Sequence, residues 1–269
     1  MPELAEVQTV RIVLKKQILN KTIKDIKILY SNIIETNIDV FKEKLIGKCF
    51  IDIKRKGKYL IFETEDHYLI SHLRMEGKYF IKPLSDEINK HEHIIFKFDD
   101  FDLRYHDTRK FGKMALIEKT NLESYFRNIG PDANSDVDVS YLYNKLNSKK
   151  KPIKSLLLDQ SIIAGLGNIY VDEVLFASKI NPLELGSNLS LADCQNILES
   201  SKNILDNAIK YKGTTIRSYT SSLNVEGEYQ NYLKVHTKAG MPCNCGDVIS
   251  CIKVGGRSTY YCPSCQRLK

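Results

Sequence analysis

The chain has 269 residues and a formal net charge of +7, because 40 Lys and Arg residues stand against 33 Asp and Glu residues. This length can bury a sizeable core and predicts two domains with a small third unit. The positive charge favours a polyanionic partner. Charged residues interrupt the apolar positions near the N-terminus, and no apolar stretch approaches membrane-spanning length. We therefore expect a cytoplasmic protein with no membrane partner.

The N-terminal segment predicts an amphipathic helix. Its apolar residues recur at steps of three and four, namely Leu4, Val7, Val10, Leu14 and Ile18. Pro2 stands in the first-turn position that helices favour. Pro2 is also a small residue after an initiator Met, so we expect Met1 to be removed and the proline nitrogen to become a secondary amine.

Such an amine has chemistry of its own. An α-amino group titrates near pH ~7.7–8, so a useful fraction is unprotonated at neutral pH. It can attack an aldehyde-level carbon such as C1′ of a deoxyribose, and the resulting iminium is an electron sink. Glu3 and Glu6 are three residues apart and share one helix face near the amine. This pattern predicts an acid/base site, and the alternative is ordinary helix N-terminal chemistry that suits the dipole.

From the first helix to about residue 118 the pattern predicts β-strands. The prediction rests on two hairpins, residues 50–62 with a turn at 55–58 and residues 94–105 with a turn at Asp99-Asp100. Hairpins of this kind are typical of an antiparallel sandwich or barrel.

The second half of the chain predicts helices after a linker at 130–136, where turn-forming residues cluster. Ser190 and Asp193 have capping-box spacing and open a long amphipathic stretch. Residues 165–168 (Gly-Leu-Gly-Asn) lack the preceding strand and the third glycine of a dinucleotide loop. As a turn between helices they can present backbone N–H groups to a phosphate, and Lys154 lies just upstream.

Five of the seven cysteines lie at or after position 243. Without a secretory signal, a metal site is a better interpretation than disulfides. Four of them have the spacing of a tetrahedral zinc ribbon, Cys243, Cys245, Cys262 and Cys265. The first knuckle has one intervening residue rather than two or more, so Cys251 or His236 stays open as a replacement ligand. The alternative is a degenerate tail without metal.

Two predicted loops carry side chains suited to opening a duplex. Met75 lies among charged residues in the first, and Arg109-Lys110-Phe111 follow Asp107 in the second. Proteins that open duplex DNA insert apolar or planar side chains into the base stack. Taken singly, each is also an ordinary core or surface residue.

Together these segments resemble the formamidopyrimidine-DNA glycosylase family of bifunctional base-excision enzymes. The resemblance runs from Pro2 to Gln266 and joins five motifs in the family's order. They are the Pro2-Glu3 start, the Lys58 hairpin, residues 107–112, residues 165–170 and the terminal finger. The resemblance implies an α+β fold with an N-terminal antiparallel β-sandwich and flanking helices, a C-terminal helix–two-turn–helix domain and a zinc finger of the four-cysteine type.

The implied domains are a catalytic β-sandwich at 1–130, a helix–two-turn–helix domain with a damaged-base loop at 131–225, and a zinc finger at 226–269. One structural Zn²⁺ would be bound by the four cysteines. The implied partner is double-stranded DNA with oxidised bases or abasic sites, bound by a monomer. This partner places the expected cytoplasmic protein at the nucleoid.

The resemblance also implies roles for individual residues. Pro2 is the nucleophile that forms a Schiff base at C1′, Glu3 helps to open the sugar ring, and Arg109 faces the orphaned cytosine. The implied catalytic group is Pro2, Glu3, Glu6, Lys58 and Arg257. The implied DNA contacts and gap-filling residues are His72, Met75, Arg109, Lys110, Phe111, Lys154, Asn168 and Arg257. The implied damaged-base region is Glu76, Thr214, Thr215, Ile216, Arg217, Ser218 and Tyr219.

The implied activity is removal of oxidised purines, such as 8-oxoguanine and formamidopyrimidines, followed by β,δ-elimination at the abasic site. One alternative is an endonuclease VIII-like glycosylase for oxidised pyrimidines, although Leu4 and residues 109–111 favour the purine branch. The other is a non-catalytic, zinc-dependent DNA-binding relative, against which Pro2, Glu3 and Lys58 argue.

Three features depart from the family's pattern. Ala5 replaces a usual second proline, which makes the helix start less rigid. His236 stands where a phosphate-contacting tyrosine is usual, and an imidazole can still donate. The third is the shortened Cys243–Cys245 knuckle. None removes the nucleophile or its carboxylate, so we expect activity to survive.

Overall fold

The computed structural model describes residues 1–214 and 227–269, which form two compact units. The first unit is Met1–Arg127 with Lys212–Gly227, and the second is Asn128–Tyr211 with Glu228–Lys269. The predicted loop residues Thr215, Ile216, Arg217, Ser218 and Tyr219 lie outside the described residues. Within the described ranges, no helix is long and apolar enough to span a membrane.

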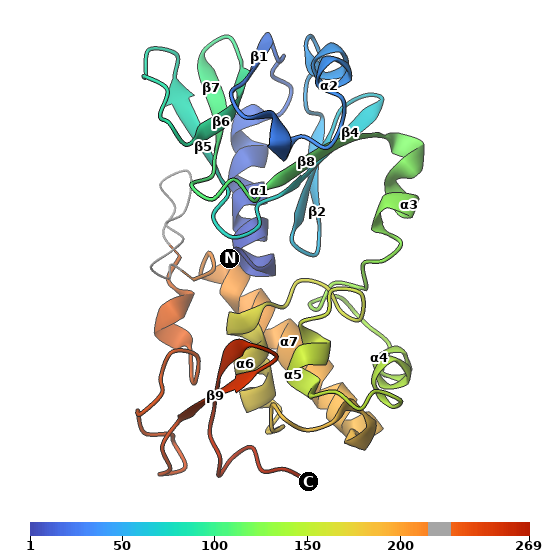
Figure 1. Cartoon of the computed structure of the whole chain (residues 1–269), viewed down its shortest axis with the longest axis vertical. Coiled ribbons are helices and arrows are strands. Elements are labelled where there is room, and N and C mark those ends of the chain that lie inside the picture. The colour runs from blue at the N-terminus through green and yellow to red at the C-terminus, as the bar shows by residue number, and fades with distance from the viewer. Residues whose placement is uncertain (215–226) are drawn as a thin grey trace. The chain divides into compact units, whose positions relative to one another are not determined.

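The first unit is an antiparallel β-sandwich with helices, as predicted. Its sheets have the strand orders β1-β6-β7-β5 and β2-β3-β4-β8 (Figure 1). The first sheet comprises β1 (Asp25–Ile28), β6 (Glu92–Lys97), β7 (Phe101–His106) and β5 (Lys78–Pro83). The second comprises β2 (Asp52–Lys56), β3 (Tyr59–Glu63), β4 (His67–His72) and β8 (Lys113–Glu118). The helices are α1 (Leu4–Ile18), α2 (Ile38–Leu45) and α3 (Leu122–Phe126).

One hydrophobic core joins α1, α2 and the inner faces of both sheets. The predicted apolar stripe of α1 is buried along its length, and the two predicted hairpins are β2–β3 and β6–β7. Phe62 of β3 and Tyr79 of β5 meet across the sandwich with ring centroids 5.6 Å apart. This packing gives α1 a fixed support, so the residues at its start occupy defined positions.

The second unit is built from helices and a terminal β-hairpin. Its elements are α4 (Val139–Leu146), α5 (Ile153–Leu157), α6 (Asn168–Ala177), α7 (Leu191–Lys210), β9 (Ser250–Val254) and β10 (Arg257–Tyr261). The predicted capping box of Ser190 and Asp193 begins α7. Gly255 and Gly256 form the β9–β10 turn with φ of 56° and 75°, a conformation that glycine adopts without steric cost.

Candidate active site and DNA-binding residues

The start of α1 gathers Pro2, Glu3 and Glu6 in a buried position. Glu3 is the N-cap residue, and its side chain accepts a hydrogen bond from the backbone N–H of Glu6. In return the Glu3 N–H donates to Glu6 Oε2 at 2.9 Å. A reciprocal pair of this kind satisfies two orphan donors of a helix start. It also fixes both carboxylates beside the predicted nucleophile.

Glu6 also contacts a residue that is distant in the sequence. Its Oε1 accepts from the backbone N–H of Thr214 at 2.8 Å and from the Thr214 hydroxyl at 3.1 Å. Gly213 has φ of 79°, and a Cβ there would lie 2.6 Å from the same oxygen. Gly213 therefore permits both the turn and the close approach. Of the predicted damaged-base region, the structure brings Thr214 to the Pro2 site through Glu6.

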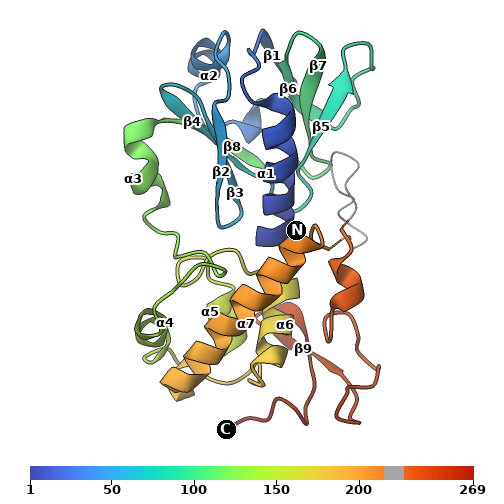
Figure 2. The same ribbon diagram turned by 180° about the vertical axis from the view of Figure 1, so that it is seen from behind.

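Lys58 lies in the β2–β3 turn and is buried. Two hydrogen bonds attach this hairpin to α1: Arg11 Nε donates to Ile53 O at 2.7 Å, and Arg55 Nε donates to Gln8 Oε1 at 3.0 Å. The hairpin tip lies at the same end of the unit as the start of α1 in both views (Figure 2). The scaffold thus places an ammonium group at the end of the sandwich that carries Pro2.

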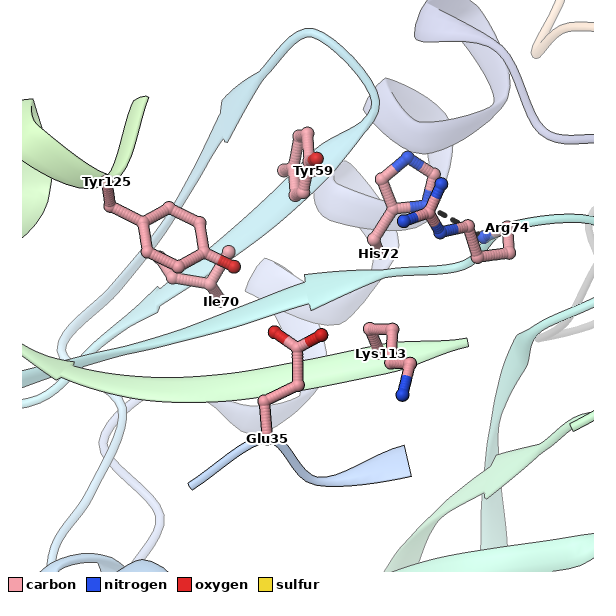
Figure 3. A pocket seen from close by; sticks show the side chains of 7 residues that line it. All are labelled: Glu35, Tyr59, Ile70, His72, Arg74, Lys113 and Tyr125. Carbon is pink, nitrogen blue, oxygen red and sulfur yellow. Dashed lines mark hydrogen bonds between the residues drawn. The ribbon is translucent and has the colours of Figure 1, made fainter. Parts of the chain in front are cut away.

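His72 lines a pocket of about 130 Å³ on the outer face of the β2-β3-β4-β8 sheet (Figure 3). The lining residues are Glu35, Tyr59, Ile70, His72, Arg74, Lys113 and Tyr125. The Arg74 N–H donates to His72 Nδ1 at 2.9 Å, so the neutral ring carries its proton on Nε2. Burial, together with the charges of Arg74 and Lys58, lowers the pKa of His72 to about 3. His72 is therefore a neutral donor at physiological pH.

The two predicted gap-filling loops lie beside each other in the first unit. Met75 and Phe111 are 38% and 51% exposed, so both side chains are accessible to a partner. The Arg109 guanidinium lies 4.8 Å from the centroid of the Phe111 ring. Thr108 donates a hydrogen bond to Glu76, so the Glu76 carboxylate ties one loop to the other.

Lys110, the remaining predicted DNA contact of this loop, is exposed. Its ammonium lies 4.5 Å from the centroid of the Tyr30 ring. Its φ of 58° is left-handed, which turns the chain between Arg109 and Phe111.

In the second unit, Lys154 and Asn168 converge on the β9–β10 hairpin. Lys154 Nζ and Asn168 Nδ2 each donate to Ser258 O at 3.0 Å. Lys154 is fully buried and also forms a 2.7 Å ion pair with Asp172. Arg257, next to Ser258, is exposed. The structure therefore brings the three predicted phosphate contacts together, with Arg257 facing solvent and Lys154 inside the unit.

Sequence reasoning missed the two acidic residues of α6. Asp172 accepts from Lys154 and, at 2.7 Å, from His236 Nδ1. Glu173 accepts the backbone N–H groups of Lys234, Val235 and His236 at 2.8–2.9 Å. Adjacent carboxylates in an apolar helix were the available signal, because buried charges need partners. Asp172 therefore joins Lys154 and His236 inside the second unit.

The four predicted zinc ligands lie together. The sulfur atoms of Cys243, Cys245, Cys262 and Cys265 are all within 4.8 Å of one another. The Cys243–Cys265 and Cys245–Cys262 sulfur distances are 3.8 and 3.5 Å. Zinc–sulfur bonds of about 2.3 Å in a tetrahedron require sulfur atoms about 3.8 Å apart, so the residues fit Zn²⁺. The short knuckle therefore reaches the site, and neither Cys251 nor His236 belongs to the cluster.

The turn after the first knuckle supports this geometry. Gly246 has φ of 92° and its N–H donates to Cys243 O at 2.9 Å. Hydrogen bonds from the Asp247 backbone and from the neighbouring thiols lower the pKa of Cys245 to about 7, whereas burial raises the pKa of Cys262.

Models of protein families match most of the chain. Residues 1–114 match the formamidopyrimidine-DNA glycosylase N-terminal domain, and residues 129–220 match the formamidopyrimidine-DNA glycosylase H2TH domain. Residues 244–268 match a zinc finger found in FPG and IleRS. The chain belongs to the formamidopyrimidine-DNA glycosylase family. It is a DNA repair glycosylase with a four-cysteine zinc finger.

Full-length relatives agree with this assignment. The formamidopyrimidine-DNA glycosylase of Enterococcus faecalis is 43% identical over 275 residues, which cover 100% of this chain and 98% of that protein. That of Ligilactobacillus salivarius is 45% identical over 276 residues, with both chains covered completely.

Solved structures of a relative are also similar. A Lactococcus lactis FPG mutant in complex with a Fapy-dG containing DNA has 44% identity and a TM-score of 0.95, and covers 99% of this chain and 100% of that one. A complex of Lactococcus lactis Fpg with an abasic site containing DNA has 44% identity and a TM-score of 0.94, with 98% and 99% covered.

Proposed function

We propose that this glycosylase removes formamidopyrimidines and 8-oxoguanine from double-stranded DNA and then cleaves the strand at the abasic site by β,δ-elimination. The observation that carries the proposal is the buried arrangement of Pro2, Glu3 and Glu6 at the start of α1. Relatives bound to Fapy-dG and abasic-site DNA support the substrate class. The protein acts as a monomer on chromosomal DNA, which places it in the cytoplasm at the nucleoid.

Removal of Met1 gives Pro2 its nucleophilic amine. The nitrogen lone pair forms a bond to C1′ as the glycosidic bond breaks, and the base departs with that bond's electrons and a proton. The Glu3 carboxyl group then gives a proton to the ring oxygen, the C1′–O4′ bond opens, and an iminium remains. Glu6 keeps Glu3 in place through its N–H.

The iminium supplies the driving force for strand cleavage. Loss of a C2′ proton expels the 3′ phosphate, and loss of a C4′ proton then expels the 5′ phosphate. Water finally releases the sugar fragment from Pro2. Lys58 contacts phosphate and sugar next to the reacting atoms, and Arg257 assists from the finger.

DNA contacts divide into two groups. His72, Asn168 and Arg257 contribute to holding the phosphate backbone, which positions the duplex without reading sequence. The buried Lys154 contributes through Ser258 O, next to Arg257. Met75, Arg109 and Phe111 fill the gap left by the extruded nucleotide, while Lys110 supplies charge nearby. Arg109 donates to the acceptors of the orphaned cytosine.

Borohydride trapping tests the proposal. The chain with Met1 removed should form a covalent adduct with an 8-oxoguanine:cytosine duplex, because borohydride reduces the iminium to a stable amine. The matched control keeps a short extension ahead of Pro2, which turns the amine into an amide and should abolish the adduct. A chain that binds the duplex without forming an adduct would be a binding protein. Faster trapping on an oxidised pyrimidine would indicate the endonuclease VIII-like activity.

A further inference from the structure

Residue Asp107 precedes the exposed side chains of the second gap-filling loop and is itself fully buried. Its backbone is held on both sides. The Asp107 N–H donates to His91 O at 3.0 Å, and the Asp107 carbonyl accepts from His93 Nε2 at 2.8 Å. Asp107 is therefore fixed to β6 and the residue before it, at the base of the loop.

The carboxylate of Asp107 organises the rest of the loop. Oδ1 accepts the Arg109 N–H at 3.0 Å, and Oδ2 accepts the N–H groups of Phe111 and Gly112 at 2.9 and 2.8 Å. Three backbone donors thus point at one side chain. An asparagine cannot replace it, because its NH₂ group must face at least one of these N–H groups. A carboxylate at this position fixes the backbone of both proposed DNA-contacting residues, Arg109 and Phe111.

The two gap-filling loops also share a support. The Tyr105 hydroxyl lies so close to both that a Cβ on Gly77 would be 2.2 Å away and a Cβ on Gly112 would be 1.6 Å away. Gly77 closes the loop that carries Met75, since its N–H donates to Leu73 O at 2.9 Å. The Tyr105 side chain is fully buried, so this contact is part of the folded interior and not a transient contact at the surface.

We propose that Asp107 is a positioning residue for base excision, and that the Tyr105 hydroxyl sets the spacing between the two gap-filling loops. This inference rests on the proposed function, which gives Met75, Arg109 and Phe111 their role in the gap. Loops that are ordered before binding lose less conformational freedom when they enter the duplex. Asp107 and Tyr105 do not contact DNA themselves. They act through the loop side chains that do.

The test compares Asp107→Asn with Asp102→Asn in the full chain. Asp102 is a buried carboxylate of β7, the strand that ends just before Asp107, and it accepts hydrogen bonds from the Arg104 side chain at 2.9 and 3.1 Å. Amide hydrogen exchange of the free protein should become faster at residues 109–112 in Asp107→Asn only. Single-turnover excision of 8-oxoguanine opposite cytosine should fall about tenfold relative to cleavage of a preformed abasic site, where no base has to be extruded.

Tyr105→Phe provides a second variant that removes one oxygen and should fold. It should increase amide exchange in both loops, at residues 73–77 and 109–112, whereas Asp107→Asn should affect only the second. Acceleration in one loop alone would refute the spacing role of Tyr105.

The outcomes separate this inference from the proposed function. Equal losses on both substrates in Asp107→Asn, with an active wild type, would mean that Asp107 only supports the fold and would overturn the inference alone. A wild-type chain that forms no borohydride adduct would refute the proposed function, and the inference would fall with it.

Discussion

The two carboxylate oxygens of Glu6 accept hydrogen bonds from the Glu3 N–H and from the N–H and hydroxyl of Thr214. The side chain is buried, so water does not replace a lost partner. A neutral amide would have to turn its NH₂ group toward one of these donors. The Glu6 carboxyl group therefore determines the positions of Glu3 and Thr214.

Replacement of Glu6 by Gln tests this role. We expect about tenfold slower formation of the borohydride adduct on both lesion-containing and abasic duplexes, since the change acts on the Pro2 site itself. Glu43→Gln is the matched control, because Glu43 lies exposed on α2. Adduct formation at the wild-type rate in Glu6→Gln would contradict a positioning role for the carboxylate.

The buried imidazole of His72 predicts a pH dependence of stability. Burial, reinforced by the Arg74 and Lys58 charges, lowers its pKa from 6.5 to about 3. Between these pH values the unfolded chain binds a proton that the folded chain does not, so stability falls as pH falls from 6.5 toward 3. The slope from this residue is about 1.4 kcal/mol per pH unit.

Denaturant unfolding at pH 7 and at pH 5 measures this effect. The wild type should lose more unfolding free energy between these two pH values than His72→Gln, because the glutamine does not titrate. At pH 7 the imidazole is mostly neutral in both states, so the two proteins should differ mainly below pH 6.5. Parallel pH profiles for the two proteins would show that His72 takes up its proton in the folded state.

At the scale of elements, a hydrogen-bond network with the buried residues Lys154 and Asp172 at its centre joins the hairpin β9–β10 to α5 and α6. Lys154 and Asn168 both donate to Ser258 O, while Asp172 links Lys154 to His236. A Cβ on Gly255 would lie 3.0 Å from Ser155 Oγ, so the hairpin turn lies directly against α5. The exposed Arg257 lies on β10, and the hydrogen-bond network fixes the position of this hairpin.

Replacing Lys154 and replacing Arg257 should therefore change different properties of the protein. Lys154→Ala leaves Asp172 without its ammonium partner, and breaking a buried pair costs about 3–5 kcal/mol of stability. Arg257→Ala should leave the unfolding free energy unchanged and reduce the salt dependence of DNA affinity by about one unit of slope.

Urea unfolding and DNA titrations at several salt concentrations separate the two effects. If Lys154→Ala were as stable as the wild type, the ion pair with Asp172 would contribute nothing. If Arg257→Ala kept the full salt slope, Arg257 would not contact a phosphate.

Local patterns were sufficient to predict α1, the two hairpins, the capping box of α7 and a zinc site built from the terminal cysteines. Each of these depends on residues close in sequence, whose periodicity or spacing carries the information. The contacts of Asp172 were beyond reach because they depend on tertiary packing: His236 lies 64 positions away. The shortened Cys243–Cys245 knuckle was undecided for the same reason, since only the folded turn shows that both sulfurs reach the cluster.

At the scale of the whole molecule, the β-sandwich and the zinc finger have separate clusters of buried apolar side chains. One cluster joins α1, α2 and both sheets of the first unit, and its members come from residues 7 to 116. Another contains Val235 and Ile249 with Cys243 and Cys262, two of the zinc ligands. The second cluster is small, so its stability depends on the metal to a degree that the first does not.

Removal of zinc should therefore act on one part of the chain. We expect a chelator to accelerate amide exchange across β9, β10 and the cysteine turns, and to leave the strands of the β-sandwich protected. DNA affinity should fall about tenfold or more, because the backbone contact offered by Arg257 depends on an ordered hairpin. Exchange mass spectrometry and a DNA titration on the same sample measure both effects, with zinc added back as the control. Loss of protection throughout the sandwich would contradict separate clusters in the sandwich and the finger. Unchanged exchange in the hairpin would show that the finger folds without metal.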